Sequence, residues 1–297
     1  MIVYTSFLLF FLLNFLYIFI WNKNFKEKPT GGGIFLLIPF IYFCIIQNVD
    51  LEILISLVFC SIIYYFDDLV KIDYKIRIGL QILAALIIFY NFREKINIEY
   101  LFLIVLLFFI IINTFNFQDG QDLNIFVILF LIFVLFYYYS NQKIIENTSM
   151  LILFYLISFG IFNKKPSKLY FGDSGCYVAT IIIFTFCIVE LKNVHLIKSI
   201  VAILIFPITD IVLVIIYRIF NRENLLSRNH YHIYQKLYKK DKYYVYLLPN
   251  IFFAAVNFSF FQYFYLDIKK IFFVLILNAL SCLMIHFFLN KFLYHDN

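Results

Sequence analysis

The feature that most constrains this fold is a succession of long apolar runs separated by short polar segments. Runs of about 17 to 25 residues are long enough for an α-helix to cross the hydrocarbon core of a bilayer. A helix also satisfies its own backbone hydrogen-bonding groups, as lipid requires. The composition agrees, because 64% of the residues are hydrophobic and only 14% are charged, a mixture foreign to a soluble domain. The sequence therefore predicts an all-α, polytopic integral membrane protein.

The apolar pattern predicts about 10 to 11 transmembrane helices in a single transmembrane domain, residues 1–297. The first run has no basic residue before it and no small-residue cleavage site after it, so we expect it to be retained as a span. The expected spans are 2–20, 34–47, 51–66, 77–92, 99–116, 124–140, 148–162, 175–191, 196–217, 243–266 and 271–289.

The distribution of lysine and arginine predicts the orientation. With the first residue outside, 17 of the 24 basic residues fall in inner loops and 7 in outer loops. This asymmetry follows the positive-inside rule, so we expect an outer N-terminus and a cytoplasmic C-terminus. The inner loop 218–242 is the most basic. The orientation of the chain in the membrane and attraction to anionic lipid explain about half of the positive charge of this loop. The remaining positive charge is available to bind a phosphorylated substrate.

Acidic patches at the ends of the apolar runs are the strongest functional signal. They comprise Asp67-Asp68, the segment 116–122, the segment 172–175 and Asp210. A carboxylate at the centre of a membrane helix costs roughly 2.5 to 3.5 kcal/mol, so acids placed near helix ends indicate a task. The predicted orientation places all four patches on the cytoplasmic side, which favours one common site.

The adjacent acids Asp67 and Asp68 favour a hard metal ion. Neighbouring side chains on a helix point about 100° apart, so one can hold a metal while the other orients a lysine or a substrate group. Mg²⁺ is typically held by one or two carboxylates together with substrate phosphates. The alternative is a helix end at the membrane surface, where the pair forms salt bridges with Lys71 or Lys75.

The segment 113–122 sets Asn113, Asn116, Asp119 and Asp122 around Gly120. Asparagine both donates and accepts hydrogen bonds, which suits recognition of a nucleobase or a ribose. Gly120 allows the chain to turn sharply and approach a ligand. The alternative, a plain polar turn between two spans, explains the glycine and one acid but not the whole set.

The sequence Gly172-Asp173-Ser174-Gly175 is expected to open a helix, where backbone N–H groups and the helix dipole favour anions. The alternative is an ordinary N-cap. The five cysteines have neither metal-ligand nor disulfide spacing. Aromatic pairs such as Tyr64-Tyr65 fit belts at the membrane surface. The isolated histidines, for which we expect packing or interfacial roles, are His195, His286 and His295.

Taken together and in order, six motifs resemble the polyprenyl-phosphate N-acetylhexosamine-1-phosphate transferases, glycosyltransferase family 4. The resemblance covers residues 29–237. The motifs are Pro29-Thr30-Gly31-Gly32-Gly33; Asp67-Asp68 with Arg77 and Gln81; Asn113-x-x-Asn116-x-x-Asp119-Gly120-x-Asp122; Asn163-x-x-Pro166-Ser167-Lys168 running into Phe171-Gly172-Asp173-Ser174-Gly175; Pro207-x-x-Asp210 with Arg218; and His230-Tyr231-His232-Ile233-Tyr234-Gln235-Lys236-Leu237.

The resemblance implies transfer of an N-acetylhexosamine-1-phosphate from a UDP-sugar to undecaprenyl phosphate, with UMP as the second product. It implies a Mg²⁺ cofactor, with Mn²⁺ as an alternative ion. The partners it implies are UDP-N-acetylhexosamine, undecaprenyl phosphate and membrane lipid, with no nucleic acid; a homodimer is compatible. The expected location is the bacterial inner (cytoplasmic) membrane.

The resemblance also assigns roles to residues, carried over position by position. The implied metal ligands are Asp173 and Asp67. The implied catalytic residues are Asp67, Asp68, Asp173 and His232, with Asp68 the candidate for a general base. The implied substrate-binding residues are Asn113, Asn116, Asp119, Gly120, Asp122, Asn163, Lys71, Arg77 and His230.

The chain departs from the family pattern at several positions. Leu123 stands where the family has a glycine, and Cys176 stands where a serine is common. The adjacent histidines of the last motif are reduced to the spaced pair His230 and His232, followed by Ile233. That variant resembles the branch that initiates O-antigen synthesis more than the peptidoglycan enzyme.

Two other classes of function remain open at this point. Intramembrane acids also mark the ion-coupled pathways of transporters and of flippases for lipid-linked saccharides. Such sites usually lie near the membrane midplane, whereas these acids collect at one surface. The departures at Leu123 and Ile233 support a second alternative, a family member that binds but does not catalyse.

Overall fold

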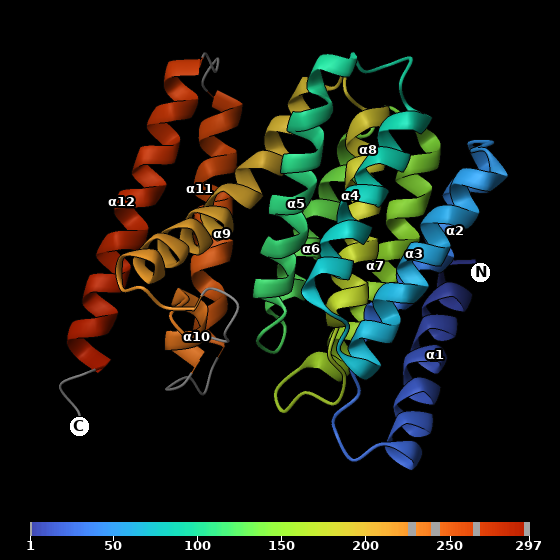
Figure 1. Ribbon diagram of the computed structural model, residues 1–297, viewed down its shortest axis with the longest axis horizontal. Helices are drawn as coiled ribbons and strands as arrows, with labels where there is room; N and C mark the ends of the chain where they lie inside the picture. Colours follow the sequence, from blue (N-terminus) through green and yellow to red (C-terminus); the bar gives the residue numbers. More distant parts are fainter. Residues whose placement is uncertain (1, 225–229, 239–243, 264–267, 294–297) are drawn as a thin grey trace. The chain divides into compact units, whose positions relative to one another are not determined.

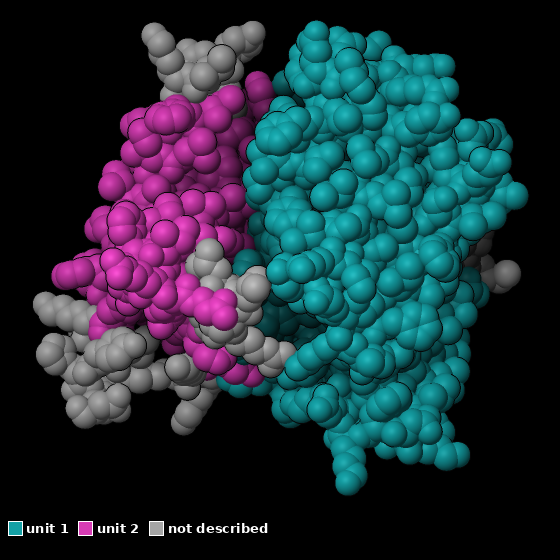
Figure 2. All heavy atoms as spheres, viewed as in Figure 1, with its two compact units in different colours: residues 1–196 teal, residues 197–297 magenta. Residues whose placement is uncertain are grey.

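The computed structural model describes residues 2–224, 230–238, 244–263 and 268–293. The chain divides into two compact units, Met1–Leu196 and Ile197–Asn297, coloured teal and magenta in Figure 2. Every regular element in the described ranges is a helix (Figure 1), which confirms the predicted all-α class.

Unit 1 carries the longer series of helices. Its elements are α1 (Ile2–Asn24), η1 (Gly32–Leu36), α2 (Leu37–Ile46), α3 (Leu51–Val70), α4 (Tyr74–Asn91), η2 (Ile98–Tyr100), α5 (Leu101–Gln118), α6 (Asn124–Tyr139), α7 (Lys143–Asn163) and α8 (Gly172–Val189).

Helix α8 forms the centre of unit 1. In the most apolar 18-residue stretch of α8, 83% of the residues are buried, against 17% in the corresponding stretch of α1. Helix α8 packs against α3, α4, α5 and η1, while α7 packs against α1, α2 and α6. The hydroxyl of Tyr155 on α7 donates to the carbonyl oxygen of Gly32 at 2.9 Å, which ties η1 to the second group of helices. The start of α8 therefore lies where several helices of unit 1 meet.

Unit 2 consists of α9 (Val194–Phe220), whose first three residues belong to unit 1, followed by α10 (Ile233–Tyr238), η3 (Val245–Leu247), α11 (Leu248–Tyr263) and α12 (Ile268–Leu293). A reciprocal amide pair joins α11 to α12: Asn257 donates to Asn278 at 3.1 Å, and Asn278 donates back at 2.9 Å. Both side chains are buried, so this pair satisfies polar groups that would otherwise be costly inside an apolar helix pair.

Among the described residues, nine helices are long and apolar enough to cross a membrane, and Gly32–Ile46 and Asn124–Tyr139 are shorter apolar helices. Large apolar side chains point outward, as on a lipid-facing surface: Phe102 is 78% exposed and Phe220 82% exposed. The chain is thus a polytopic membrane protein, as the sequence predicted.

The helix ends differ from the predicted spans by several residues. Helix α3 continues to Val70, so the acids at 67 and 68 lie inside its last turn rather than beyond it. The segment predicted as 34–47 begins with the short 3-10 helix η1, for which Gly31 supplies a left-handed φ of 83°. Of the predicted span 243–266, the structure describes η3 and α11, and residues 243 and 264–266 lie outside the described ranges.

Candidate functional site

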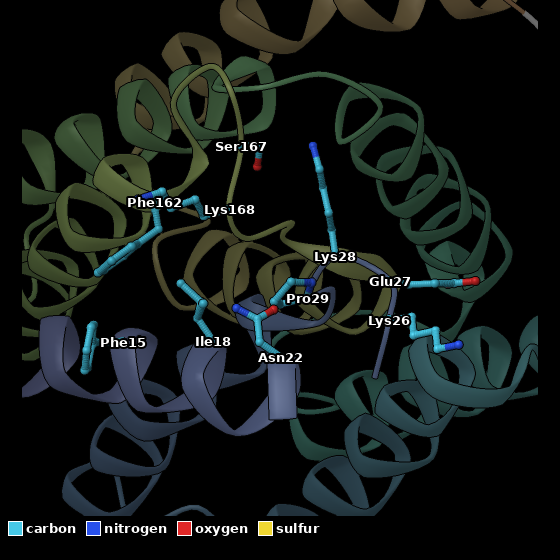
Figure 3. Close-up of a pocket in the computed structure, with 10 residues that line it drawn as sticks. All are labelled: Phe15, Ile18, Asn22, Lys26, Glu27, Lys28, Pro29, Phe162, Ser167 and Lys168. Atoms are coloured by element: carbon cyan, nitrogen blue, oxygen red, sulfur yellow. The ribbon is translucent and has the colours of Figure 1, made fainter. Parts of the chain in front are cut away.

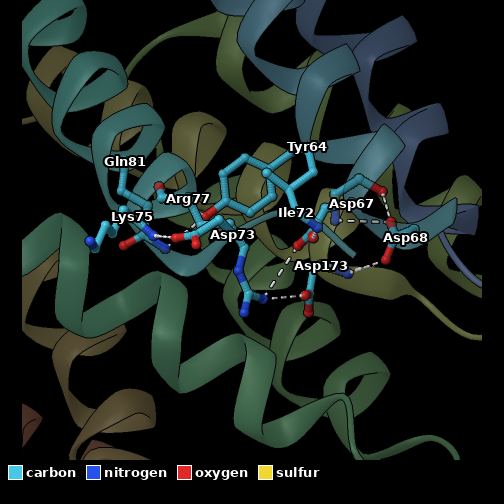
Figure 4. A network of polar contacts seen from close by, with 10 residues as sticks. Tyr64, Asp67, Asp68, Ile72, Asp73, Lys75, Arg77, Gln81 and Asp173 are labelled. Carbon is cyan, nitrogen blue, oxygen red and sulfur yellow. Dashed lines mark hydrogen bonds and ion pairs between the residues drawn. The ribbon is translucent and has the colours of Figure 1, made fainter. Parts of the chain in front are cut away.

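Acidic residues of α3 and α8 meet a basic residue of α4 at the first turn of α8 (Figure 4). The guanidinium of Arg77 on α4 joins two of them. Its Nη1 lies 3.3 Å from Oδ2 of Asp67 on α3 and 3.0 Å from Oδ2 of Asp173 on α8. The Asp67 side chain is only 4% exposed, whereas that of Asp173 is 38% exposed. The site therefore holds one buried and one accessible carboxylate around a single positive charge.

The neighbouring acid, Asp68, caps α8. Its Oδ1 accepts the backbone N–H of Asp173 at 2.9 Å, and its Oδ2 accepts the N–H and the hydroxyl of Ser174 at 3.1 and 2.5 Å. Helix N-termini leave backbone N–H groups without partners in the helix, and a carboxylate satisfies them while matching the helix dipole. The two adjacent aspartates thus point to different tasks, as the sequence analysis expected from their spacing.

Asp119, which follows the last residue of α5, completes this cap. Its Oδ2 accepts the N–H of Gly172 at 2.8 Å, whereas its buried Oδ1 has no hydrogen-bond partner among the described residues. Burial raises the pKa of Asp119 well above its usual range, and the charges of Asp173 and Asp68 act in the same direction. The N–H groups at the start of α8, which were expected to favour anions, are therefore bound by the protein's own carboxylates.

Glycines allow η1 to lie directly against the start of α8. Gly33 donates its N–H to the carbonyl oxygen of Phe171 at 2.9 Å. A Cβ added at Gly33 would lie 2.3 Å from the Cα of Gly175, closer than any side chain tolerates. Gly172 has a φ of 84°, and a Cβ there would lie 2.4 Å from the backbone nitrogen of Gly31. The two glycine-containing motifs therefore form one backbone contact that fixes Asp173.

Asn163 holds the turn after the segment 113–122. Its Oδ1 accepts the N–H of Leu123 at 2.7 Å, and its Nδ2 donates to the carbonyl oxygen of Leu169 at 2.8 Å. Leu123 has a φ of 60°, in the left-handed region that favours glycine. The glycine-to-leucine departure therefore falls at a position where the backbone conformation itself favours glycine.

The remaining predicted residues of this segment have separate environments. The amide of Asn113 donates to the carbonyl oxygen of Phe109 in its own helix at 2.7 Å. The buried Oδ1 of Asn116 has no hydrogen-bond partner in the part of the chain that the structure describes. Asp122 is buried, and Gly120 is exposed. The structure thus brings Asp119 to the start of α8, while Asn113 is turned toward its own helix.

Lys71 follows the last residue of α3 and is exposed. The described ion pair of Asp67 is with Arg77, not with Lys71 or Lys75 as in the alternative considered for the sequence. Tyr64, which we expected in a belt at the membrane surface, is fully buried. Its hydroxyl accepts the amide of Gln81 at 2.7 Å and donates to the backbone oxygen of Arg77 at 3.4 Å. The expectation for Tyr64 was wrong because burial depends on α8, which packs against α3.

The donor set fits a hard cation that shares its coordination with a ligand. Two carboxylates from different helices, Asp67 and Asp173, already converge on one positive charge, the Arg77 guanidinium. Within the described ranges, no group of three or more His, Cys, Asp or Glu side chains is arranged to hold a metal ion. A metal here would therefore take one or two carboxylates and complete its shell with water or phosphate oxygens, which is the habit of Mg²⁺.

A pocket of about 490 Å³ is lined in part by Pro29, Ser167 and Lys168, which belong to two of the six sequence motifs (Figure 3). Apolar side chains of α1 and α7, Phe15, Ile18 and Phe162, line it together with three lysines, Lys26, Lys28 and Lys168, and one acid, Glu27, so the charge of the lining is net positive. The ammonium of Lys28 also lies 5.8 Å from the centre of the Tyr170 ring. The combination of an apolar wall and positive charge matches an anionic amphiphile.

Unit 2 contains a second polar cluster. The carboxylate of Asp210 on α9 lies between two imidazoles, with Oδ2 3.0 Å from Nδ1 of His232 and Oδ1 2.8 Å from Nε2 of His286. His230, two residues before His232, is exposed. The sequence analysis assigned His286 to packing or the interface, but its ring bonds a buried carboxylate. Sequence spacing gave no signal for this contact, because His286 lies 76 residues from Asp210.

Comparison with known proteins finds a similarity to one family over part of the chain. Residues 51–191 match the family model of glycosyl transferase family 4. This range contains Asp67, Asp68, the segment 113–122 and Asp173, and it excludes unit 2.

Bacterial proteins named phospho-N-acetylmuramoyl-pentapeptide-transferase are among the curated relatives. The protein from Lactobacillus johnsonii is 26% identical over 52% of this chain and 59% of its own length. The protein from Fervidobacterium nodosum is 26% identical over 54% and 61%, and that from Thermotoga maritima is 25% identical over 51% and 57%. The chain thus spans about three fifths of the length of these relatives. Together with the apolar helices, the relatives support a multi-pass protein of the bacterial inner membrane.

Proposed function

We propose that this chain transfers an N-acetylhexosamine-1-phosphate from a UDP-sugar to undecaprenyl phosphate, giving undecaprenyl-pyrophosphoryl-sugar and UMP. The observation that carries the proposal is the meeting of Asp67, Asp173 and Arg77 at the first turn of α8, within the range that matches the family. The asymmetry of lysine and arginine supports a cytoplasmic location for this site.

The proposed reaction is a phosphoryl transfer with little covalent work for the protein. An oxygen of the lipid phosphate attacks the sugar-bearing phosphorus of the UDP-sugar, the bond to the bridging oxygen breaks, and UMP leaves. Catalysis of this type rests on positioning and on electrostatic stabilisation of the developing charge. Arg77, whose charge cannot be lost at neutral pH, is suited to both tasks.

Asp173 and Asp67 are the proposed ligands of Mg²⁺. When bound, the ion would neutralise phosphate oxygens as charge builds up on them. The accessible Asp173 would meet the ion and the donor phosphates, while the buried Asp67 would hold Arg77 and share the ion. Asn116 and Asp122 remain proposals for the uridine end.

Asp68 and Asp119 are proposed to build the site rather than to react. Both carboxylates bind backbone N–H groups at the start of α8, which fixes the direction of Asp173. The role of Asp68 as a general base stays a prediction. The lipid phosphate has a second pKa near 6, so most of it is dianionic at neutral pH and a strong base is optional. His232 is the proposed contact for the remaining protonated form.

The identity of the sugar separates two candidates. The spaced pair His230 and His232 supports the initiation of an O-antigen-like polysaccharide, which would use a UDP-N-acetylhexosamine. The names of the relatives favour a second candidate, transfer of phospho-N-acetylmuramoyl-pentapeptide in cell-wall synthesis.

The test is to incubate the purified full chain with Mg²⁺, undecaprenyl phosphate and one UDP-sugar at a time, and to measure UMP and the lipid product. UDP-N-acetylglucosamine and UDP-N-acetylgalactosamine test the first candidate, and UDP-N-acetylmuramoyl-pentapeptide tests the second. Release of UMP that requires the lipid phosphate supports the proposal. Movement of a lipid-linked saccharide between the two leaflets of a vesicle membrane, without any UMP release, would instead identify a flippase.

A further inference from the structure

The polar cluster of unit 2 extends beyond the Asp210 carboxylate to a lysine. The ammonium of Lys236 on α10 lies 3.0 Å from Nδ1 of His286 on α12 and donates to Oδ1 of Asn290 at 2.8 Å. With the contacts of Asp210, this gives a chain of hydrogen bonds in the order Lys236, His286, Asp210 and His232. Three elements of unit 2 and the residue just before α10 therefore contribute to one network.

The chemistry of the two ends fixes the direction of each bond. A lysine ammonium has three donors and no acceptor, so Nδ1 of His286 must accept. The neutral His286 ring then carries its proton on Nε2 and donates it to Oδ1 of Asp210. An ionised carboxylate only accepts, so Nδ1 of His232 donates to Oδ2 of Asp210. The neutral His232 ring thus has its lone pair on Nε2.

Burial makes the network dependent on every member. The side chains of Asp210 and His232 are 3% and 1% exposed, and that of His286 is 14% exposed. Burial disfavours the ionised form of a carboxylate unless hydrogen-bond donors compensate for the lost water. Besides His286, Oδ1 of Asp210 accepts the backbone N–H of Ile233, at a longer distance of 3.4 Å.

We propose that His286 is a positioning residue for the transfer reaction. It keeps Asp210 ionised and oriented, and Asp210 in turn keeps His232 in the Nδ1–H tautomer with Nε2 as the basic nitrogen. This inference rests on the proposed function, which gives His232 a phosphate to contact. It adds a residue of α12, outside the range that matches the family, to the residues of unit 2 that are proposed to act in the reaction.

The step that His232 would perform is a proton transfer. Nε2 takes the P–OH proton of a lipid phosphate monoanion, which leaves the phosphate as the attacking dianion and His232 as an imidazolium. The charge of Asp210 stabilises that imidazolium, as the buried carboxylate does in an Asp–His pair of hydrolases. The imidazolium Nε2–H then donates to a phosphate oxygen.

The first measurement reports the tautomer without any need for activity. The chain has five histidines, so ¹⁵N-histidine labelling gives a readable imidazole spectrum in detergent micelles, and His232→Gln assigns the signal of interest. We expect the wild type to show the Nδ1–H tautomer at His232. Asp210→Asn places an amide donor beside Nδ1, so it should invert the tautomer to Nε2–H.

Matched substitutions at His286 separate its two contacts. A glutamine places its amide nitrogen near the position of Nε2, so His286→Gln keeps the donor to Asp210. An asparagine reaches only the Nδ1 position, so His286→Asn keeps the Lys236 contact and loses the Asp210 contact, and His286→Leu loses both. We expect wild-type tautomer and kcat within about threefold for His286→Gln. For His286→Asn and His286→Leu we expect a shift toward the Nε2–H tautomer and a kcat lower by about tenfold or more, with KM for the UDP-sugar changed less than kcat.

The outcomes distinguish this inference from the proposed function. If wild-type protein releases no UMP, the proposed function fails, while the spectra still test the network. If His286→Leu and His286→Asn keep both the wild-type tautomer and a kcat within about threefold, His286 has no positioning role and the inference is overturned. Loss of kcat in His286→Gln to the level of His286→Leu, with an unchanged tautomer and thermal midpoint, also overturns it.

Discussion

The two polar clusters of this protein handle charge in different ways. In unit 1, carboxylates meet a guanidinium and backbone N–H groups, which do not change their charge near neutral pH. In unit 2, one carboxylate lies between two imidazoles, and imidazole is a group that can change its charge near neutral pH. The first cluster is suited to hold a fixed charge such as a metal–phosphate pair, and the second is suited to move a proton. The comparison indicates that the composition of the partners, more than the presence of aspartate, decides what an intramembrane acid can do.

The largest effect is expected when the charge of the accessible acid of unit 1 is removed. We expect Asp173→Asn to lower Mg²⁺-dependent UMP release by at least about 100-fold, because it removes both a proposed metal ligand and one of the two carboxylates that pair with Arg77. Asp73→Asn is the matched control, since Asp73 is an exposed aspartate that caps α4 close by. Near-normal turnover of the Asp173 variant would remove this residue from the metal role.

A Mg²⁺ titration compares the two clusters directly. Asp67→Asn should raise the Mg²⁺ concentration needed for half-maximal activity by about tenfold, because one of two proposed ligands is weakened. Asp210→Asn should lower kcat but leave that concentration within about twofold of wild type, because its carboxylate belongs to the proton network. An equal shift in both variants would contradict the division of roles.

Removal of the shared positive charge tests whether Mg²⁺ can replace it. Arg77→Ala leaves Asp67 and Asp173 without their guanidinium and should destabilise the protein by about 1 to 3 kcal/mol, less than for a fully buried pair because the Arg77 side chain is 37% exposed. Added Mg²⁺ should raise the thermal midpoint of Arg77→Ala more than that of the wild type, measured in detergent. Arg77→Lys is the charge-preserving control. An identical Mg²⁺ response in wild type and Arg77→Ala would argue against a cation at these carboxylates.

The backbone framework of unit 1 can be tested apart from its charges. Gly33→Ala should destabilise the protein by about 1 to 3 kcal/mol, because the new methyl group meets Gly175 at 2.3 Å. Gly79→Ala is a matched control, because a Cβ at Gly79 has no atom within 4 Å and alanine favours helices by about 0.5 to 1 kcal/mol. Thermal midpoints should therefore move in opposite directions. If both substitutions lowered the thermal midpoint by the same amount, the close contact of η1 with α8 would not be the reason why alanine is unfavourable at position 33.

The smallest expected effect concerns the departure at Leu123. Its φ of 60° disfavours any residue with a Cβ, so Leu123→Gly should be more stable than Leu123→Ala by about 1 kcal/mol. The alanine variant controls for loss of the leucine side chain. Thermal unfolding of the two variants side by side gives the difference, and a more stable alanine variant would contradict the left-handed conformation of this turn.

Much of the acid cluster could be predicted from the sequence. The predicted grouping of Asp67, Asp68 and Asp173 is present at the start of α8, and the spacing of the first two indicated separate roles. The catalytic and metal roles of these residues stay predictions. Three features were not predictable: the burial of Tyr64, the use of Asp119 as a helix cap, and the contact of His286 with Asp210. Each depends on a partner far away in the chain.

The helices and the membrane class follow from the sequence alone, because helix length and hydrophobicity are local properties that lipid selects directly. Which carboxylates end up at helix ends also follows from the sequence. Only the tertiary structure decided which of them carry backbone N–H groups and which keep an oxygen for a ligand. The physical reason is that hydrogen bonds and steric contacts act over about 3 Å, so they depend on packing between segments rather than on neighbours in sequence.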